Sequence, residues 1–242
     1  IRNILIIVNK GQLLQFKKIL QDGRRFGVKI TYAEQIKPVG LPDAFILGEK
    51  FIGKDKVALI LGDNFFYGQS LTKKLKDCIK MNSGCRILIH PVSKPELYGV
   101  ANINTNGKVI SIKEKPKKSK SNFAITGLYF FDNKVVNFSK TLKPSKRREI
   151  EIVDLLNKYK RKNQLKFEFL GRGGAWLDTG SIEDFYKTSA FVSAIENRKG
   201  FKIACLEEIS LNKKWINKKN IINSIKFYGN CEYSNYLKKL IN

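Results

Sequence analysis

Short apolar runs alternate with amphipathic segments along the chain, and this pattern predicts an α/β layered fold. The opening run, Ile1–Val8, is mostly apolar and predicts a buried strand. Residues 12–20 carry apolar side chains at helical spacing, which predicts an amphipathic helix that ends near Gly23. Residues 28–33 predict a second strand, and residues 41–48 predict a short helix.

Three further apolar segments predict strands of a central sheet. Val57–Leu61 is a continuous apolar run, which is typical of a parallel strand buried on both faces. Residues 86–91 predict a strand after an intervening helix, and Phe123–Phe131 alternates in the manner of a sheet strand. No internal repeat or linker divides the sequence, so we expect these strands to share one sizeable core.

Two longer helices are predicted in the second half of the chain. Residues 149–162 predict a helix whose inward face carries Ile150, Val153, Leu156 and Tyr159. Ser181 and Asp184 form a capping-box pattern, which predicts the start of another helix. That helix is expected to end before Gly200 and to bury Phe185, Phe191, Ala194 and Ile195.

The clearest local signal is a β-hairpin around the pair Asn106-Gly107. Two alternating segments, residues 98–103 and 108–113, flank this pair, which suits a tight type I′ turn. A two-residue loop without a bulge would place Gly99 opposite Glu114. It would also place Tyr98 opposite Lys115.

The charge of the chain is strongly positive, with 46 Lys and Arg against 21 Asp and Glu and a formal net charge of +25. Taken alone, this charge indicates a polyanionic partner. The lysines are spread through the whole chain, however, and the densest run, Lys113–Lys120, lacks the interleaved aromatic residues of a nucleic-acid stacking surface. We therefore expect no nucleic-acid partner, and polyanion binding is kept only as a hypothesis from another functional class.

Membrane insertion and disulfide chemistry are not expected. No segment approaches the roughly 18 consecutive apolar residues of a membrane span, and the opening run is too short for a secretory signal. The four cysteines form no C-x-x-C pair and have no histidine cluster beside them. We expect buried, reduced thiols in a cytoplasmic protein.

Two carboxylates follow apolar runs and are candidates for a metal site. Asp63 comes directly after the run that ends at Leu61, and Asp178 follows the glycine-rich segment 171–174. Ligands collect at the carboxyl ends of parallel strands, and one or two carboxylates together with phosphate oxygens suit Mg²⁺. The alternative is that each aspartate merely caps a helix or a turn, and spacing alone does not separate the two interpretations.

A second candidate site lies at the end of the predicted hairpin. Lys115 is followed by Pro116, which ends strand pairing and leaves the lysine at a rim, where its compact charge suits a phosphate. The alternative is a solvated surface lysine. The hairpin would bring the open backbone of Gly99 beside Glu114, whose oxygens could accept hydrogen bonds from sugar hydroxyls. His90 has no serine or cysteine nucleophile placed with it, so we assign it a structural role.

Five sequence blocks follow one another along the chain. They are Leu61–Gly68 (LGDNFFYG), Tyr98–Val100, Glu114–Pro116, Thr126–Asp132 and residues 171–180 (GRGGAWLDTG). In order and spacing they resemble the glucose-1-phosphate thymidylyltransferase family of sugar nucleotidyltransferases. The resemblance extends from Ile1 almost to the end of the chain, and blocks in series are more specific than any single one.

This resemblance implies a Rossmann-like three-layer α/β sandwich with a mixed central sheet, the nucleotide-diphospho-sugar transferase fold. Residues 1–200 would form the core with its sugar-binding part, and residues 201–242 a C-terminal, partly helical region. The implied reaction transfers a thymidylyl group from dTTP to α-D-glucose 1-phosphate and gives dTDP-glucose and pyrophosphate, within dTDP-rhamnose and polysaccharide synthesis. A homotetramer without a membrane partner is also implied.

The resemblance further implies roles in phosphoryl transfer, a reaction that needs mostly alignment and neutralisation of charge. Mg²⁺ would be held by two carboxylates, Asp63 and Asp178. Phosphate groups would be contacted by two catalytic residues, Lys115 and Arg147.

The substrate-binding residues follow from the same blocks. The thymine base would meet Gln35 and Gly40. The glucose 1-phosphate site would be lined by Gly99, Glu114, Lys115, Ile125, Tyr129 and Trp176.

The family pattern begins with a strand and a glycine-rich G-G-x-G-T-R-L loop that holds the triphosphate. Ile1 matches the second strand of that pattern, so the first strand and the loop, about fifty residues in all, are expected to be missing. We therefore expect this chain alone to form no dTDP-glucose. The alternative to an incomplete enzyme is an inactive or regulatory relative that binds sugar nucleotide or assembles with full-length subunits. A smaller departure is Arg148, which stands where glycine is usual.

Overall fold

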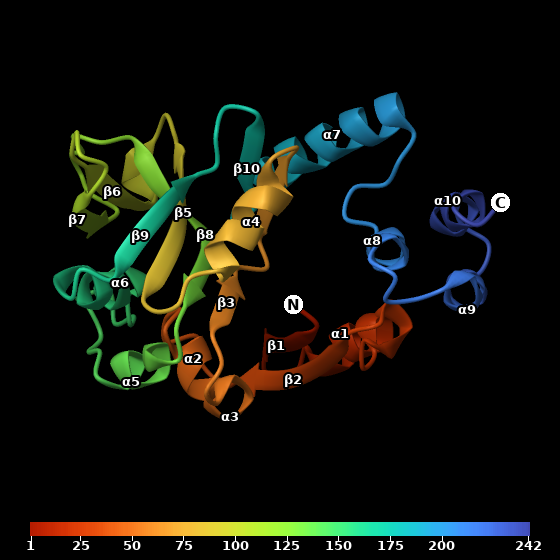
Figure 1. Cartoon of the computed structure of the whole chain (residues 1–242), viewed down its shortest axis with the longest axis horizontal. Helices are drawn as coiled ribbons and strands as arrows, with labels where there is room; N and C mark the ends of the chain where they lie inside the picture. Colours follow the sequence, from red (N-terminus) through yellow and green to blue (C-terminus); the bar gives the residue numbers. More distant parts are fainter. The chain divides into compact units, whose positions relative to one another are not determined.

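The computed structural model describes residues 1–242, which form two compact units (Figure 1). One unit comprises Ile1–Lys37 and Ser189–Asn242, and the other comprises Pro38–Thr188. Helix α7 (Ile182–Lys199) runs through the boundary between them. The predicted division into 1–200 and 201–242 stays a prediction.

A six-stranded mixed sheet organises the unit 38–188. Its main path runs β7-β6-β8-β5-β9, with β3 also paired to β8. The pair β5–β9 is parallel, whereas the pairs that involve β8 are antiparallel. The predicted α/β architecture with a mixed sheet is therefore confirmed. The strands are β3 (Val57–Ile60), β5 (Cys85–Pro91), β6 (Gly99–Ile103), β7 (Val109–Glu114), β8 (Phe123–Phe131) and β9 (Leu165–Phe169).

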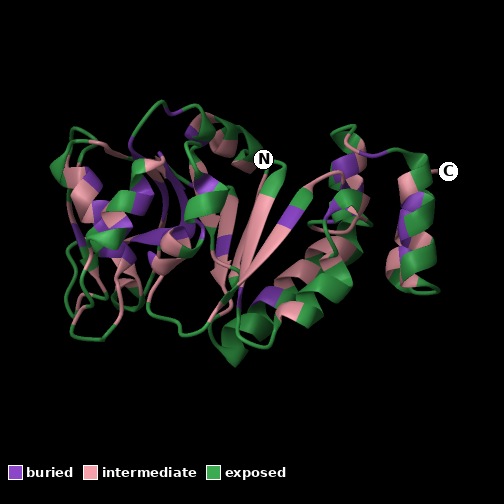
Figure 2. Ribbon diagram, turned by 90° about the horizontal axis from the view of Figure 1, so that it is seen from below, coloured by how far each residue is buried: buried purple, intermediate pink, exposed green.

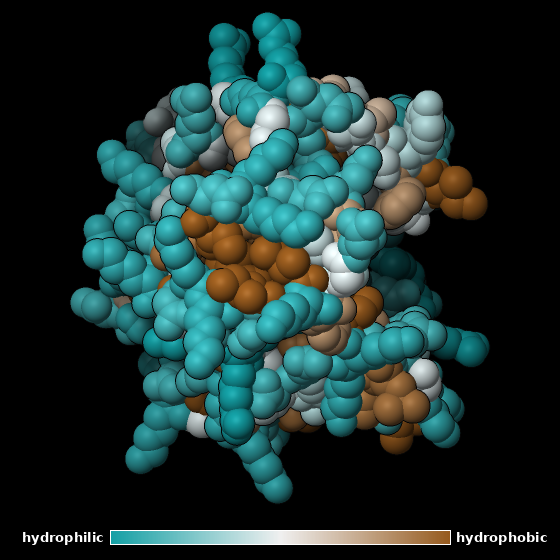
Figure 3. Space-filling model, turned by 90° about the vertical axis from the view of Figure 1, so that its right-hand side faces the viewer, coloured by the Kyte–Doolittle hydropathy of each residue, from teal (hydrophilic) through white to brown (hydrophobic).

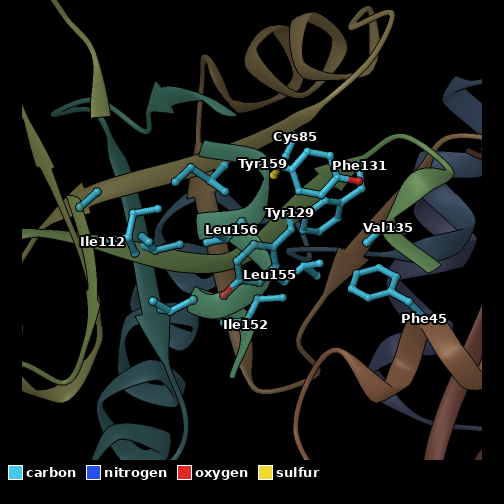
Figure 4. Close-up of a cluster of buried hydrophobic side chains, with 14 of the residues drawn as sticks. Phe45, Cys85, Ile112, Tyr129, Phe131, Val135, Ile152, Leu155, Leu156 and Tyr159 are labelled. Carbon is cyan, nitrogen blue, oxygen red and sulfur yellow. The ribbon is translucent and has the colours of Figure 1, made fainter. Parts of the chain in front are cut away.

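Side chains from both faces of this sheet enter separate apolar clusters, so helices cover it on each side. Strand β8 alternates between them: Tyr129 and Phe131 enter one cluster, and Leu128 and Phe130 enter the other. The first cluster, shown in Figure 4, receives side chains from α2 (Asp43–Leu47), α3 (Glu49–Ile52), α5 (Lys134–Lys140) and α6 (Ile152–Arg161). The second receives side chains from α4 (Leu71–Ile79).

Helix α6 faces the sheet as the sequence predicts. Val153, Leu156 and Tyr159 are buried, whereas Ile150 lies before the helix and is only half-buried. The Tyr159 hydroxyl donates a hydrogen bond of 2.7 Å to the buried Asp132 carboxylate, and this satisfies a polar group that would otherwise destabilise the core.

The predicted parallel, buried strand Val57–Leu61 is wrong in its pairing and in its burial. Strand β3 pairs antiparallel with β8, from Val57 opposite Phe131 to Ile60 opposite Leu128. Its side chains are half-buried, and Ile60 is 57% exposed. A continuous apolar run reports hydrophobicity alone, and burial on both faces also requires covering elements, which the run itself does not specify.

The hairpin of β6 and β7 is confirmed, but its turn differs from the predicted type. Asn104 and Lys108 close the loop, because Asn104 N donates to Lys108 O at 3.0 Å. Residues 105–107 therefore form a three-residue loop, in which Gly107 adopts a left-handed φ of 69°. The reason lies in Asn104, whose side-chain oxygen accepts a hydrogen bond of 2.8 Å from Lys108 N.

A bulge in β7 compensates for the longer loop. The register shifts next to Asn102, so that Ile110 has no partner on β6. Beyond this shift Gly99 pairs with Glu114, as predicted. Lys115 N donates to Tyr98 O at 3.0 Å, which also agrees with the predicted register.

A two-stranded antiparallel sheet joins distant parts of the same unit. Strand β4 (Asn64–Gly68) pairs with β10 (Gly174–Asp178), with Asn64 opposite Asp178 and Phe66 opposite Trp176. Gly68 and Gly174 lie so close that a Cβ on Gly68 would be 2.9 Å from the Gly174 Cα. The pairing thus requires a glycine at its far end.

The other unit begins with a parallel strand pair. Strand β1 (Asn3–Asn9), helix α1 (Leu13–Leu20) and strand β2 (Lys29–Gln35) follow the predicted order. The predicted burial of β1 is wrong for most of the strand, because Val8 is buried whereas Ile4–Ile7 are half-buried (Figure 2).

Three short helices form the C-terminal part of this unit. They are α8 (Leu206–Asn212), α9 (Lys218–Tyr228) and α10 (Glu232–Lys239), and they share an apolar cluster around Ile221 and Leu237. Inside it the buried Glu207 accepts a hydrogen bond of 2.6 Å from the Tyr233 hydroxyl. Three cysteines are buried as expected, whereas Cys231 is exposed.

Helix α7 is capped as predicted, but it does not bury the predicted residues. The Ser181 hydroxyl accepts a hydrogen bond of 3.1 Å from Asp184 N. Phe185 is 62% exposed, Ala194 is exposed, and Thr188 is the buried residue of the helix. Apolar side chains are distributed around this helix rather than along one stripe, so their spacing did not identify a buried face.

The surface reflects the lysine-rich composition. On the face shown in Figure 3, hydrophilic side chains surround an apolar patch. None of the helices combines the length and the hydrophobicity that a membrane crossing requires.

Gly40 is held against the backbone that precedes α6. Its φ is 122°, and a Cβ at this position would lie 2.1 Å from the Ile150 carbonyl oxygen. Ile150 N in turn donates to Val39 O at 2.7 Å, which fixes the close approach. Any side chain at residue 40 would break this contact.

We expect Gly40→Ala to lower the free energy of unfolding by at least about 3 kcal/mol, because it combines backbone strain with a clash against main chain. Gly53→Ala is the matched control, since Gly53 also has positive φ but open space around its Cβ position. That control carries only backbone strain and should cost about 1–3 kcal/mol, less than Gly40→Ala. Urea melts of both variants measure the difference, and equal losses would contradict the assigned role of the Ile150 contact.

Candidate functional site

A pocket of about 180 Å³ in the unit 38–188 collects most of the predicted site residues. Its walls come from β6, β7, β8, β10 and α6, together with the loop before β4. Seven predicted residues line it: Gly99, Glu114, Lys115, Ile125, Tyr129, Trp176 and Asp178. Asp63 is hydrogen-bonded to Asn64, which also lines the pocket.

The β6–β7 hairpin places a glycine, which has no side chain, next to a carboxylate in the pocket. Gly99 lies opposite Glu114, and a Cβ on Gly99 would be 3.3 Å from the Glu114 Oε2 atom and 3.2 Å from the Val153 side chain. The absence of a side chain at Gly99 therefore leaves room beside an acceptor oxygen. Lys115 follows immediately, at a left-handed φ of 39°.

The charge of Glu114 depends on its neighbours. Burial raises the pKa of the Glu114 carboxyl, and the Glu151 carboxylate raises it further. The cations of Lys115 and Arg147 act in the opposite direction, and Arg147 Nη1 lies 3.6 Å from Glu114 Oε1. A cation or a hydroxyl donor that enters the pocket would therefore favour the ionised carboxylate.

Arg147 lies over an adjoining pocket of about 550 Å³, which shares Glu114 and Lys115 with the first. Its guanidinium forms ion pairs with Glu149 at 3.1 Å and with Glu151 at 3.8 Å. The arginine is 43% exposed, so solvent weakens these pairs. Arg147 is thus close to the predicted phosphate contact, Lys115, and is held by carboxylates.

The structure explains why glycine suits the position of Arg148. Arg148 has a φ of 63°, in the left-handed region that favours glycine, and its N–H donates to Ser145 O at 2.9 Å. The turn that presents Arg147 therefore carries backbone strain in this chain.

The two predicted metal ligands come together through the β4–β10 pair rather than through parallel strand ends. Asp63 immediately precedes β4, and Asp178 ends β10 opposite Asn64. The N–H and the hydroxyl of Thr179 both donate to the Asp63 carbonyl oxygen at 2.8 Å. The backbones that carry the two carboxylates are therefore hydrogen-bonded to each other.

The electrostatics of these carboxylates suit a cation. Burial raises the pKa of Asp178, and the charge of Asp63 contributes to the rise, whereas a hydrogen bond from Gly180 N at 2.9 Å opposes it. A cation between the carboxylates would relieve their mutual repulsion. No group of three or more His, Cys, Asp or Glu side chains is arranged to hold a metal. Any ion here would therefore need further oxygen ligands from water or substrate.

Two residues at the centre of the pocket were not predicted from the sequence. Asn64 accepts a hydrogen bond of 2.6 Å from Trp176 Nε1, and Gly127 N donates to the same Asn64 oxygen at 3.0 Å. They stand inside the sequence blocks LGDNFFYG and TGLYFFD, respectively. The only sequence signal for these two residues was their closeness along the chain to the predicted site residues Asp63 and Tyr129.

The two residues predicted to meet the base belong to different units. Gly40 belongs to the unit 38–188 and is not among the residues that line the pocket. Gln35 is the last residue of β2, in the other unit. Their contact with a base stays a prediction.

His90 packs on the outer side of Trp176, with the ring centroids 6.4 Å apart. Burial lowers the pKa of the imidazole, and its Nδ1 atom has no hydrogen-bond partner. This environment agrees with the structural role expected from the sequence.

Comparison with known proteins gives consistent matches. The profile of the family described as "Nucleotidyl transferase" matches residues 1–195. The glucose-1-phosphate thymidylyltransferase of Neisseria meningitidis is 44% identical over 241 residues, which cover 100% of this chain and 84% of that protein. The enzyme of the same name from Mycobacterium tuberculosis is 39% identical and covers 100% and 83% of the two chains.

Solved structures agree with this result. A Bacillus anthracis crystal structure, described as a glucose-1-phosphate thymidylyltransferase in complex with sucrose, superposes with a TM-score of 0.72 at 38% identity. The match covers 79% of this chain and 76% of that one. A UDP-glucose pyrophosphorylase with bound UDP-glucose superposes at 0.67 over 80% and 81% of the chains, and at 21% identity it supports the fold alone. The predicted nucleotide-diphospho-sugar transferase fold is thus confirmed.

We expect Glu151→Gln to lower the pKa of Glu114. The Glu151 charge raises that pKa, so its removal makes the Glu114 carboxyl easier to ionise, and the titration midpoint moves to lower pH. Carbon-13 NMR titration of the Glu114 side chain measures the shift. Glu149→Gln is the control, because Glu149 is the weaker of the two raising charges and should give a smaller shift in the same direction. An upward shift in Glu151→Gln would contradict this account of the pocket.

Proposed function

Because this chain belongs to the nucleotidyl transferase family, with glucose-1-phosphate thymidylyltransferases among its relatives, we propose that its 180 Å³ pocket binds glucose 1-phosphate for thymidylyl transfer. The phosphate oxygen of the sugar attacks the α-phosphorus of dTTP. The bond from that phosphorus to the bridging oxygen breaks, and pyrophosphate leaves as dTDP-glucose forms.

One observation carries the proposal. A single pocket is lined by residues from four separate strands and from the loops beside them. They include the residues that the sequence blocks associate with the sugar phosphate. Glu114 and the open backbone at Gly99 provide acceptors and room for sugar hydroxyls, and Trp176 and Tyr129 provide apolar walls. Lys115 at the rim supplies a compact positive charge for the phosphate.

A divalent cation, Mg²⁺ in the simplest case, fits the paired carboxylates Asp63 and Asp178, with substrate oxygens completing its shell. When bound, such an ion neutralises charge that develops on the transferred phosphoryl group. Arg147 has a complementary role, since exchange of its carboxylate partners for a phosphate would bring a second cation to the substrate.

The remaining assignments rest on the resemblance of the sequence blocks alone. We include in the proposal the thymine contacts of Gln35 and Gly40, a homotetrameric assembly, a cytoplasmic location and a place in dTDP-rhamnose and polysaccharide synthesis. The division into a core of residues 1–200 and a C-terminal region of 201–242 belongs with these.

In contrast to the inactivity expected from the missing loop, the proposal predicts turnover, and it predicts that Asp178→Asn lowers the rate of dTDP-glucose formation about 100- to 1,000-fold at saturating Mg²⁺, because one charge that holds the ion is lost. Pyrophosphate release from dTTP and glucose 1-phosphate measures the rate. Asp55→Asn is the matched control: Asp55 is an exposed carboxylate of the same unit that does not line the pocket, and its loss should leave the rate unchanged.

Calorimetric binding of glucose 1-phosphate completes this test. Binding that weakens in Glu114→Gln, together with turnover that depends on Asp178, supports the enzyme. Binding without turnover in the unmutated chain would favour the inactive or regulatory relative instead. Turnover that survives Asp178→Asn would contradict the assigned cation site.

A further inference from the structure

Every polar atom of the Asn64 side chain is engaged, and its partners belong to different parts of the site. The Nδ2 group donates to Asp63 Oδ1 at 2.7 Å. The Oδ1 atom accepts from Trp176 Nε1 at 2.6 Å and from Gly127 N at 3.0 Å. One amide therefore links a candidate cation ligand, a wall of the sugar pocket and the central strand β8.

These contacts allow only one orientation of the amide. Rotating it by half a turn would direct the NH₂ group at two N–H donors and the oxygen at a carboxylate. The two donors, Trp176 Nε1 and Gly127 N, thus determine that an N–H points at Asp63.

The surrounding backbone is shaped for this side chain. A Cβ on Gly127 would lie 2.5 Å from Asn64 Oδ1 and 2.6 Å from its Cγ atom, so the amide rests directly on the glycine. On the other side, Thr179 holds the Asp63 carbonyl oxygen through two hydrogen bonds of 2.8 Å. Both the main chain and the side chain of Asp63 are therefore held.

We propose that Asn64 is a positioning residue that fixes the Asp63 carboxylate for a divalent cation. The hydrogen bond from Asn64 occupies one lone pair of Oδ1 and prevents the carboxylate from turning away from Asp178, whose charge repels it. This inference rests on the proposed function, because it takes Asp63 and Asp178 as the cation ligands. Hydrogen-bond donors behind a metal ligand typically change metal affinity about 10- to 100-fold.

The same amide connects the cation ligand to the sugar pocket. Trp176 is 8% exposed, packs on Tyr98 with the ring centroids 5.1 Å apart, and reaches the pocket from β10. A sugar that contacts this indole also contacts the side chain whose Nε1 donor orients the Asn64 amide. Occupation of the pocket and the orientation of Asp63 are thus coupled through one side chain.

Mn²⁺ serves as the probe for a direct test, with free ion measured by electron paramagnetic resonance. Asn64→Ala is expected to weaken Mn²⁺ binding about 10- to 100-fold. Trp176→Phe removes an indole donor but leaves the amide beside Asp63, so it should weaken Mn²⁺ binding less than about 3-fold, below the range for a lost ligand support. Equal Mn²⁺ affinity in the wild-type protein and in Asn64→Ala would overturn the inference.

A second variant guards against loss of the fold in Asn64→Ala. Asn64→Asp keeps an acceptor for both Trp176 and Gly127 but removes the donor to Asp63. It should still melt cooperatively, while its rate with Mg²⁺ falls at least about 10-fold because the donor to Asp63 is replaced by a carboxylate that repels it. A wild-type rate in Asn64→Asp would show that Asn64 only supports structure.

Two further variants separate this inference from the proposed function. If Asp63→Asn and Asp178→Asn leave Mn²⁺ affinity unchanged, the proposed cation site is wrong whatever Asn64 does. If those variants weaken Mn²⁺ binding and Asn64→Ala does not, only the role of Asn64 is wrong.

Discussion

The site depends on the antiparallel pairing of β4 with β10. Asn64 and Trp176, which this pairing joins, are 112 residues apart in the chain. Closing so long a loop has an entropic cost that the pairing alone does not offset, and the main sheet and its two apolar clusters supply the rest. Once formed, the pair fixes the backbones of Asp63 and Asp178 side by side. The carboxylates, the indole wall and the Asn64 amide all take their positions from it.

The candidate site holds partly buried carboxylates that repel one another, and cations or hydroxyl donors would offset this repulsion. Burial raises the pKa of Glu114 and of Asp178, and in each case another carboxylate raises it further. The fold keeps these groups close because strand pairing and packing hold their backbones. A cation or a set of sugar hydroxyls would each favour the ionised forms. Repulsion between carboxylates in the folded chain would therefore be relieved when a cation or hydroxyl donors bind, and this relief would contribute to their affinity.

Sequence patterns predicted elements and pairings better than burial. Strand β8 and helix α1 agree with expectation because alternation and helical spacing are local signals, and Gly99 pairs with Glu114 as predicted because the bulge at Ile110 offsets the extra residue of the loop. The predicted burial of β3 and α7 was wrong, because burial depends on which distant segments cover an element. The ordered sequence blocks identified seven residues that line the pocket, whereas Asn64 and Gly127 were missed because their roles arise from contacts across three strands.

The hairpin has a consequence for how this sequence can vary between relatives. Its tip, residues 105–107, is separated from Glu114 by the bulge at Ile110. Residues can be exchanged at the exposed tip without turning the strand that carries the carboxylate. Deleting Ile110 alone would leave Asn102 opposite Ser111 and Gly99 opposite Glu114, because Ile110 is the one residue of this stretch that has no partner on β6. The end of this hairpin can therefore vary in sequence, and even in length by this one residue, as long as the strand pairs from Asn102 and Ser111 to Gly99 and Glu114 are kept.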